Sequence, residues 1–482
     1  MRFYSTNIEN IKKIKATFAY CIEFIKEYGF MSFLHHTKLS IKKGKFFIES
    51  VTVQQTSFPK ESEIFSLVPP TKKQNFEKNY KVSVVIPTNS DENTLSGLFS
   101  NIMSQKGMKE LEVILVNSGK HDLSSFQKLS NVKLINIPPE KFNHGTTRNL
   151  GASKAEGDFI LFQTDDAIPA NKNLYYELCK VLDKNPQCGC VSPIQFPRSD
   201  ADLISKYIIS NHNKFIKKYY TKIKPNSFDN LSIDQKRAVS QIDDVCACYR
   251  KNVFTKYLYS DIQFGEDVEL GVRLVKDGFE ISNIFTNCVI HSHNRDSLYW
   301  LKRGFTESMI FSQLLGIEFF QFKSEYKISS EEELFQVLLS IYKSIRLTID
   351  YLKTCEFPNV HETFREIRKN SQKYFFIDGK PNSSDPSLDY IFEKISDGLL
   401  EKKTKKILLL QSFLIALKGI ENFMKETYPS TKNVDAELYI GIYKYFGLFM
   451  GKILGQYLIN SKKYNLKTKR LTEIEKILKS GV

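Results

Sequence analysis

Short apolar runs alternate with helical stretches between residues 82 and 162, and this alternation restricts the fold more than any other feature of the sequence. It predicts strands at 82–86, 111–116, 132–137 and 159–162, and helices at 94–105 and 150–155. Strands that alternate with helices favour a mostly parallel sheet with helices on both faces. The sequence therefore predicts an α/β domain in this part of the chain.

Polar residues follow three of these strands at their carboxyl ends, where ligands bind in sheets of this kind. They include Pro87, Thr88, Glu92, Asn117, Asp165 and Asp166. The adjacent carboxylates of Asp165 and Asp166 repel each other, so they should either lie in solvent or surround a positive charge. The sequence contains neither GxGxxG after the first strand nor GxxxxGK[ST], so the phosphate-binding loops of dinucleotide oxidoreductases and P-loop enzymes are missing.

Two later segments add residue types that bind metal ions and transfer protons. Glu266 and Asp267 stand at the head of a predicted helix, and His291 and His293 follow a strand-like stretch at 281–290. Asp, Glu and His side chains bind hard or borderline divalent ions and act as acids and bases. Each pattern alone also fits a turn, a helix start or a strand end. Together, on an α/β pattern, they predict a catalytic site.

Five motifs in this order resemble the family 2 glycosyltransferases with the GT-A fold. The motifs lie within roughly residues 81–320 and read VSVVIPTNSDENTL, FNHGTTRNLGASKAEGDFILFQTDDAIP, QFPRSDADLISKY, FGEDVELGVRLVKDGF and VIHSHN. The resemblance is closest to the rhamnosyltransferase-like branch that builds bacterial O-antigen and other surface polysaccharides. It implies an inverting transfer of a sugar, such as L-rhamnose from dTDP-rhamnose, from a nucleotide-sugar donor to a glycan or lipid-linked acceptor.

The resemblance also implies roles for residues of the predicted site. Asp267 would be the base that takes the acceptor hydroxyl proton, and Glu266 would position the base or the acceptor. Asp166, with His291 or His293, would bind Mg²⁺ or Mn²⁺ at the donor diphosphate.

The residues implied in donor binding are Pro87, Thr88, Glu92, Asn117, Arg148 and Asp165. Two positions depart from the family pattern: Thr164 replaces the first carboxylate of the Asp-x-Asp motif, and Asn117 replaces an aspartate that contacts the base. The departures leave two alternatives open. One is the same mechanism with a UDP-hexose or UDP-hexosamine donor, and the other is a non-catalytic GT-A scaffold protein.

The rest of the chain predicts helical regions on either side of the GT-A domain. We expect an amphipathic helical extension and linker at 1–80, the GT-A glycosyltransferase domain at 81–300 and an α-helical C-terminal region at 301–482. In the last region Gly447, Gly451 and Gly455 fall four apart, a spacing that permits close contact with another helix.

The net charge of +15 and the basic N-terminal helix fit peripheral contact with an anionic membrane. The alternative is that this helix packs on its own domain, which is the more common arrangement of an amphipathic helix. We expect no nucleic-acid partner, because the sequence contains no RNP-like motif, Cys2His2 spacing or tight arginine cluster. No run of about 20 apolar residues and no signal-peptide pattern is present, so we expect a cytoplasmic location at the inner face of the plasma membrane. The Cys188/Cys190 and Cys246/Cys248 pairs fit buried strand residues better than zinc ligands, since their spacing is one residue rather than two.

Overall fold

The computed structural model describes residues 76–220, 227–319, 328, 330–355, 359–375, 377, 379–396, 408–427, 435–464 and 468–479. The predicted N-terminal helix and the linker up to residue 75 lie outside the described residues. The chain divides into two compact units. Of the described residues, 76–201 and 208–293 form the sheet unit, and 202–207 together with those from 294 onward form the helical unit.

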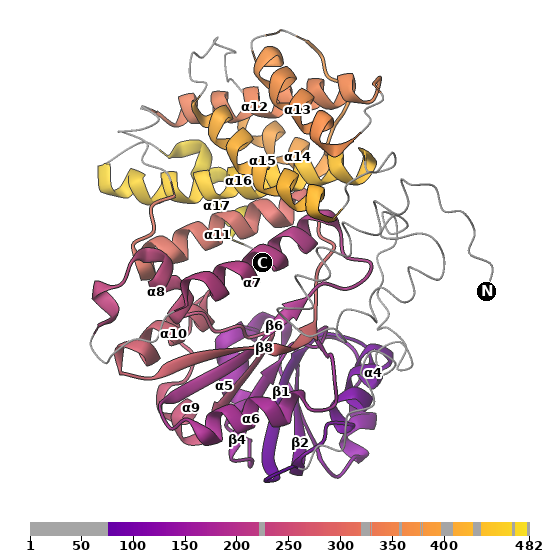
Figure 1. Ribbon diagram of the computed structural model, residues 1–482, viewed down its shortest axis with the longest axis vertical. Helices are drawn as coiled ribbons and strands as arrows, with labels where there is room; N and C mark the ends of the chain where they lie inside the picture. Colours follow the sequence, from indigo (N-terminus) through magenta and orange to yellow (C-terminus); the bar gives the residue numbers. More distant parts are fainter. Residues whose placement is uncertain are drawn as a thin grey trace, which may run out of the picture. The chain divides into compact units, whose positions relative to one another are not determined.

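The sheet unit contains an eight-stranded sheet with the order β3-β2-β1-β4-β7-β6-β8-β5 (Figure 1). The strands are β1 Tyr80–Thr88, β2 Met108–Asn117, β3 Val132–Asn136, β4 Phe159–Gln163, β5 Ile168–Pro169, β6 Cys188–Phe196, β7 Cys246–Arg250 and β8 Glu280–Ile290. The α-helices up to residue 276 are α4 Glu92–Met103, α5 His144–Ala152, α6 Leu174–Lys184, α7 Leu203–Tyr219, α8 Ile233–Val239, α9 Lys251–Tyr257 and α10 Glu266–Lys276. The α/β class and the four predicted strands are confirmed.

The helix predicted at 150–155 starts earlier than expected, because a polar side chain caps it. The Asn143 side chain accepts hydrogen bonds from the backbone N–H groups of Gly145 and Thr146, so α5 begins at His144. Such a cap satisfies donors that the first helical turn leaves unpaired. Arg148 therefore lies in the middle of α5.

Alternate residues of β1 pack against helices on opposite faces of the sheet, since successive side chains of a strand point to opposite sides. Val82 and Val84 belong to a core cluster that also contains residues of α4 and α6. On the other face, a Cβ added to Gly151 of α5 would lie 2.3 Å from Cγ1 of Val85. Only a glycine lets α5 approach this closely. Helices thus cover both faces, as predicted.

The prediction of a mostly parallel sheet is correct only for part of it. β1 runs parallel to β2 and β4, and β2 runs parallel to β3. β7, however, is inserted between β4 and β6 and runs antiparallel to both. β8 runs parallel to β6. Because two reversals restore the original direction, β6 and β8 run the same way as β4, and their carboxyl ends lie at the same edge of the sheet as those of β1, β2 and β4.

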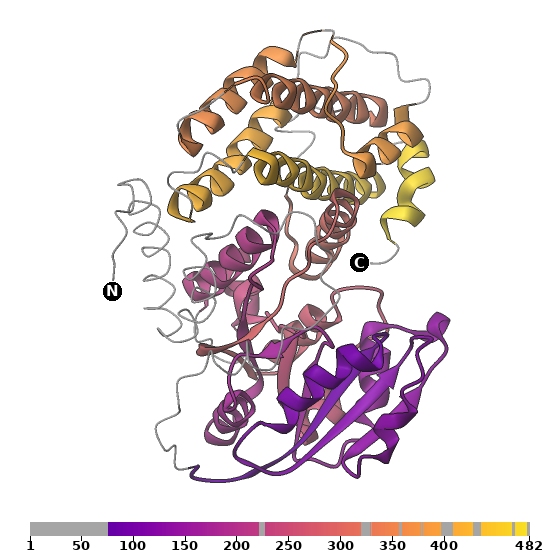
Figure 2. The ribbon, with the colours of Figure 1, turned by 90° about the vertical axis from the view of Figure 1, so that its right-hand side faces the viewer.

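The helical unit contains the expected C-terminal helices (Figure 2). They are α11 Ser297–Leu315, α12 Glu331–Leu352, α13 Val360–Tyr374, α14 Pro386–Ser396, α15 Leu408–Thr427, α16 Asp435–Tyr464 and α17 Lys469–Leu478. A Cβ added to Gly447, Gly451 or Gly455 of α16 would lie between 2.0 and 2.5 Å from a backbone carbonyl oxygen of α11. The predicted close helix contact is therefore confirmed. None of the helices in the described ranges combines the length and the apolarity needed to cross a membrane.

Candidate active site

Asp166, His291 and His293 converge at the carboxyl-end edge of the sheet. Asp166 lies just after β4, and the two histidines follow β8, so the common direction of these strands brings them together. His291 Nε2 lies 3.4 Å from Asp166 Oδ1, and His293 Nδ1 lies 3.3 Å from Asp166 Oδ2. The two Nε2 atoms are 3.1 Å apart. Within the described part of the chain, this trio is the group of acids, histidines or cysteines with a geometry that could hold a metal ion.

The trio has the chemistry of a site for a divalent ion. Burial alone would raise the pKa of the Asp166 carboxyl, but the neighbouring His291 and His293 imidazoles hold this pKa well below its usual range. Two imidazole nitrogens with a carboxylate suit borderline ions such as Fe²⁺ or Zn²⁺, and they bind the transition ion Mn²⁺ more readily than Mg²⁺, which prefers oxygen ligands. The residues therefore fit a metal ion, and a borderline ion fits them best.

A second cluster surrounds the first turn of α10. The guanidinium of Arg148 donates to Glu266 Oε1 at 2.8 Å and lies 3.5 Å from Asp244 Oδ2. All three side chains are at least nine-tenths buried. The structure thus encloses Arg148 between Glu266 of α10 and Asp244, which precedes β7. The contact of Arg148 with the donor stays a prediction.

Asp267 stands next in this helix. Its Oδ1 accepts a hydrogen bond from the N–H of Val268 at 2.7 Å, and the side chain remains partly exposed. Burial raises the pKa of the Asp267 carboxyl well above its usual range, and the Asp244 and Glu266 carboxylates raise this pKa further. A carboxyl group with a raised pKa is a stronger base than an ordinary aspartate, which suits it to accept a proton near neutral pH.

Asp244 was not predicted from the sequence. Its Oδ1 accepts from the Tyr259 hydroxyl at 2.6 Å, and this hydroxyl lies 2.9 Å from that of Tyr249. Burial raises the pKa of Asp244 to about 6; the Arg148 guanidinium opposes the rise and the Glu266 carboxylate adds to it. The only signal was an acidic pair, Asp243-Asp244, before an apolar strand. Because β7 runs antiparallel to β4, residues that precede β7 lie at the same edge of the sheet as residues that follow β4. Without the direction of β7, nothing in the sequence placed Asp243-Asp244 beside Asp165-Asp166.

One backbone contact relates the two clusters. The N–H of Thr164 donates to the carbonyl of Val245 at 3.1 Å where β4 ends and β7 begins. Asp166 follows Thr164 by two residues, and Asp244 precedes Val245 by one. The metal-binding trio and the acids around Arg148 therefore occupy the same edge of the sheet.

The loops after β1 and β4 are joined through Asp165. Its Oδ2 accepts from the hydroxyls of Thr88 at 2.7 Å and Ser90 at 2.8 Å. Burial raises the pKa of Asp165, and the charge of Asp166 raises it further. The first aspartate of the pair therefore fixes the position of the β1 loop, and the second faces the histidines.

The remaining donor-binding predictions are placed around the β1 and β2 ends. Asn117 is buried, and its amide donates to Asn136 Oδ1 at 3.0 Å and to the carbonyl of His121 at 3.1 Å. Pro87 pairs with a β2 residue in the sheet register. Glu92 accepts from the Ser125 hydroxyl at 2.7 Å. The structure thus joins Asn117 to the β3 end and to the loop after β2, and the donor-binding roles of Asn117, Pro87 and Glu92 stay predictions.

The cysteine pairs contribute to the core of the sheet unit. Cys188, Cys190, Cys246 and Cys248 are all buried and free of disulfides. Burial raises the pKa of each thiol. Neutral thiols in an apolar core behave as small hydrophobic residues.

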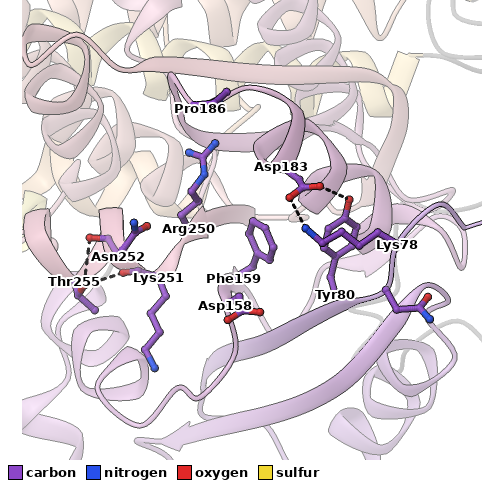
Figure 3. Close-up of a pocket in the computed structure, with 11 residues that line it drawn as sticks. Lys78, Tyr80, Asp158, Phe159, Asp183, Pro186, Arg250, Lys251, Asn252 and Thr255 are labelled. Carbon is purple, nitrogen blue, oxygen red and sulfur yellow. Dashed lines mark hydrogen bonds and ion pairs between the residues drawn. The ribbon is translucent and has the colours of Figure 1, made fainter.

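A cavity of about 640 Å³ lies at the other end of the strands, where β1 and β4 begin (Figure 3). Phe159 lies in the middle of the view, with Arg250 on one side and Asp183 on the other. The Arg250 guanidinium donates to the carbonyls of Leu182, Asn185 and Cys188, so the chain itself uses its donors. This cavity lies about 25 Å along β1 from the predicted site, at roughly 3.3 Å per residue.

Residues 83–257 match the family model described as Glycosyl transferase family 2. The chain is 29% identical over 217 residues to the O-antigen chain rhamnosyltransferase WbaN of Salmonella anatum, covering 44% of this chain and 66% of that protein. It is 26% identical over 226 residues to the O-antigen chain rhamnosyltransferase RfbN of Salmonella typhimurium, covering 44% and 67%. The alignments thus span about two thirds of the length of these relatives.

The comparison with solved structures found TarS 1-349 of S. aureus, at 14% identity and a TM-score of 0.35, covering 72% of this chain and 90% of that one. Another is the mannosyltransferase PcManGT of Pyrobaculum calidifontis in complex with GDP-Man and Mn²⁺, at 12% identity and a TM-score of 0.37, covering 90% and 96%. The match of residues 83–257 agrees with the family that the motifs predicted, and the eight-stranded sheet covered by helices agrees with the predicted α/β class. Domain and relatives together indicate a glycosyltransferase.

Proposed function

Because the chain carries a family 2 glycosyltransferase domain, we propose that it is an inverting enzyme that moves a sugar from a nucleotide-sugar donor to an acceptor hydroxyl. The proposal is supported by two features at one edge of the sheet: Asp166, His291 and His293 have a geometry that could hold a metal ion, and the pKa of the Asp267 carboxyl is raised. Inverting transfer needs both functions: a group that removes the hydroxyl proton and positive charge that stabilises the departing diphosphate.

Asp267 is the proposed base. It takes the proton of the acceptor hydroxyl while the oxygen of that hydroxyl attacks the anomeric carbon and the bond to the diphosphate breaks. Glu266 is held by Arg148 and keeps the head of α10 in place beside the base. Asp166, His291 and His293 would hold the divalent ion. When bound, the ion supplies positive charge for the diphosphate oxygens.

The relatives are named O-antigen chain rhamnosyltransferases, so dTDP-L-rhamnose is the first donor to test, with a glycan or lipid-linked acceptor of cell-surface polysaccharide synthesis. Solved structures in the comparison carry GDP-Man, UDP or UDP-GlcNAc. A UDP-hexose or UDP-hexosamine donor is therefore the alternative within the same mechanism. Contact with an anionic membrane is a further part of the proposal, supported by the charge of +15.

Metal removal tests the proposal directly. After EDTA treatment, the protein should neither transfer the sugar of any nucleotide sugar in a donor panel nor hydrolyse that donor. At equal concentration, Mn²⁺ should restore more activity than Mg²⁺, because two of the proposed ligands are imidazoles. Titration calorimetry of the metal-free protein with Mn²⁺ gives a readout independent of turnover. Full activity in EDTA would contradict the metal site, and donor binding without turnover under any metal would favour a scaffold protein.

The pH profile tests the base. Activity should fall as the pH drops through the raised pKa of Asp267, because the protonated carboxyl cannot accept the hydroxyl proton. The Asp244 carboxylate is one cause of that raised pKa. Asp244→Asn keeps an acceptor for the Tyr259 hydroxyl but removes the charge, so the acidic limb of the kcat profile should move to lower pH. A limb that stays in place or moves upward would refute this coupling.

A further inference from the structure

A chain of hydrogen bonds stands behind one ligand of the metal-binding trio. His291 Nδ1 lies 2.7 Å from the side-chain Oε1 of Gln195, which is the penultimate residue of β6. The amide Nε2 of Gln195 in turn donates to Asp243 Oδ2 at 2.6 Å. Gln195 is the first residue of the QFPRSDADLISKY motif, but the family resemblance implied no role for Gln195 or for Asp243. Both reach the site because β6, β7 and β8 are neighbours in the sheet.

The chain has one chemically consistent direction. A carboxylate only accepts hydrogen bonds, so Asp243 must face the NH₂ group of the Gln195 amide. The carbonyl oxygen of that amide is then turned toward His291. An amide oxygen is also only an acceptor, so the hydrogen between the two side chains must be on His291 Nδ1. The carboxylate thus orients the amide, and the amide selects the tautomer.

The selected tautomer leaves a lone pair on His291 Nε2, the ring nitrogen that faces Asp166 and His293. This atom lies 3.4 Å from Asp166 Oδ1 and 3.1 Å from His293 Nε2. His293 Nε2 lies within hydrogen-bond distance of this atom, and His293 Nδ1 lies 3.3 Å from Asp166 Oδ2. A metal ion bound here would take the Nε2 lone pair that a hydrogen bond otherwise uses.

We propose that Gln195, oriented by Asp243, is a positioning residue that holds His291 as the Nδ1–H tautomer and so presents Nε2 to the metal ion. The inference rests on the metal site of the proposed function and adds the residues that prepare it. An outer partner of this kind fixes the ring orientation and increases the basicity of the ligand nitrogen. The cysteine-rich core and the distant cavity of Figure 3 offer no comparable arrangement of ligand and support.

Two variants remove the support in different ways. Gln195→Met keeps the length of the side chain but removes the acceptor for Nδ1–H. Asp243→Asn keeps Gln195 but removes the charge that dictates the amide orientation. It therefore tests the inference even if the Gln195→Met protein does not fold. Removing such a support typically weakens metal binding by about 10- to 100-fold. Gln187→Met, at an exposed site of the same unit, is the matched control and should bind like the wild type.

The measurements are titration calorimetry of the metal-free protein with Mn²⁺ and NMR of metal-free protein with ¹⁵N-labelled histidine. We expect a higher Kd for Mn²⁺, and so weaker binding, in both variants. In the NMR spectra, the His291 signals of the wild type should be those of an imidazole protonated at Nδ1, and those of Gln195→Met should show a mixture of tautomers. Loss of a signal in His291→Ala assigns it. Unchanged Kd values in both variants, or a wild-type His291 protonated at Nε2 alone, would overturn the inference and leave the proposed function intact. A wild type that binds no Mn²⁺ would overturn the metal site itself.

Discussion

Replacement of Asp267 by asparagine should lower kcat by about two to four orders of magnitude, the usual contribution of a positioned general base. The amide has nearly the shape of the carboxyl and can still accept the hydrogen bond from the N–H of Val268. It cannot take a proton from the acceptor hydroxyl. The loss should therefore appear in kcat, measured at saturating donor and metal, rather than in donor binding.

A second aspartate, at the opposite end of the same helix, provides the matched control. Asp277 follows the last residue of α10, is exposed and accepts from the Tyr257 hydroxyl. Asp277→Asn makes the same chemical change away from the site and should leave kcat unchanged. Donor binding, followed by the increase in Tm that a native-state ligand causes, should be similar in all three proteins. If both Asp267→Asn and Asp277→Asn retain the wild-type kcat, Asp267 is not the base and another group takes the proton.

The sequence was sufficient to predict the residues that lie at the ends of strands. The apolar runs predicted β1, β2 and β4. The polar residues that follow these strands lie at one edge of the sheet, because the strands are parallel and their carboxyl ends meet there. Asp166 and the histidines of the HSH segment were likewise predicted together through the family resemblance. The geometry then shows the three side chains in contact.

The partners of these residues could not be predicted, because they depend on strand order. β7 follows β6 in the chain yet lies between β4 and β6, and no local pattern encodes that insertion or its direction. Asp243 and Asp244 precede β7, so without its orientation they look like an exposed turn. The helix predicted at 150–155 did not include Arg148, and the burial of its side chain against acids from two distant segments could not be predicted either. The helix predicted at 150–155 was misplaced for a local reason, since its Asn143 cap was overlooked.

Arg148→Met should destabilise the sheet unit strongly, because the guanidinium is the cation nearest to two buried carboxylates. Glu266 and Asp244 would keep their burial but lose the positive charge at 2.8 Å and 3.5 Å. Removing one partner of a buried ion pair costs about 3 to 5 kcal/mol in the free energy of unfolding. For a unit of this size, that corresponds to a fall in Tm of roughly 6 to 20 °C. Differential scanning fluorimetry of wild type and variant measures it.

The pH dependence of this loss distinguishes an electrostatic cause from a packing defect. Without Arg148, which lowers the pKa of Asp244 in the native protein, that pKa should rise further above its unfolded value. A carboxyl group with a raised native pKa contributes stability below that pKa and loses it as the pH increases. The Tm deficit of Arg148→Met should therefore be larger near about pH 8 than near about pH 5.5, and adding Asp244→Asn should reduce it. Lys81→Met, which breaks an exposed ion pair with Glu110, should leave Tm nearly unchanged. An Arg148→Met deficit that is equal at both pH values would mean that lost packing, rather than unpaired charge, destabilises the unit.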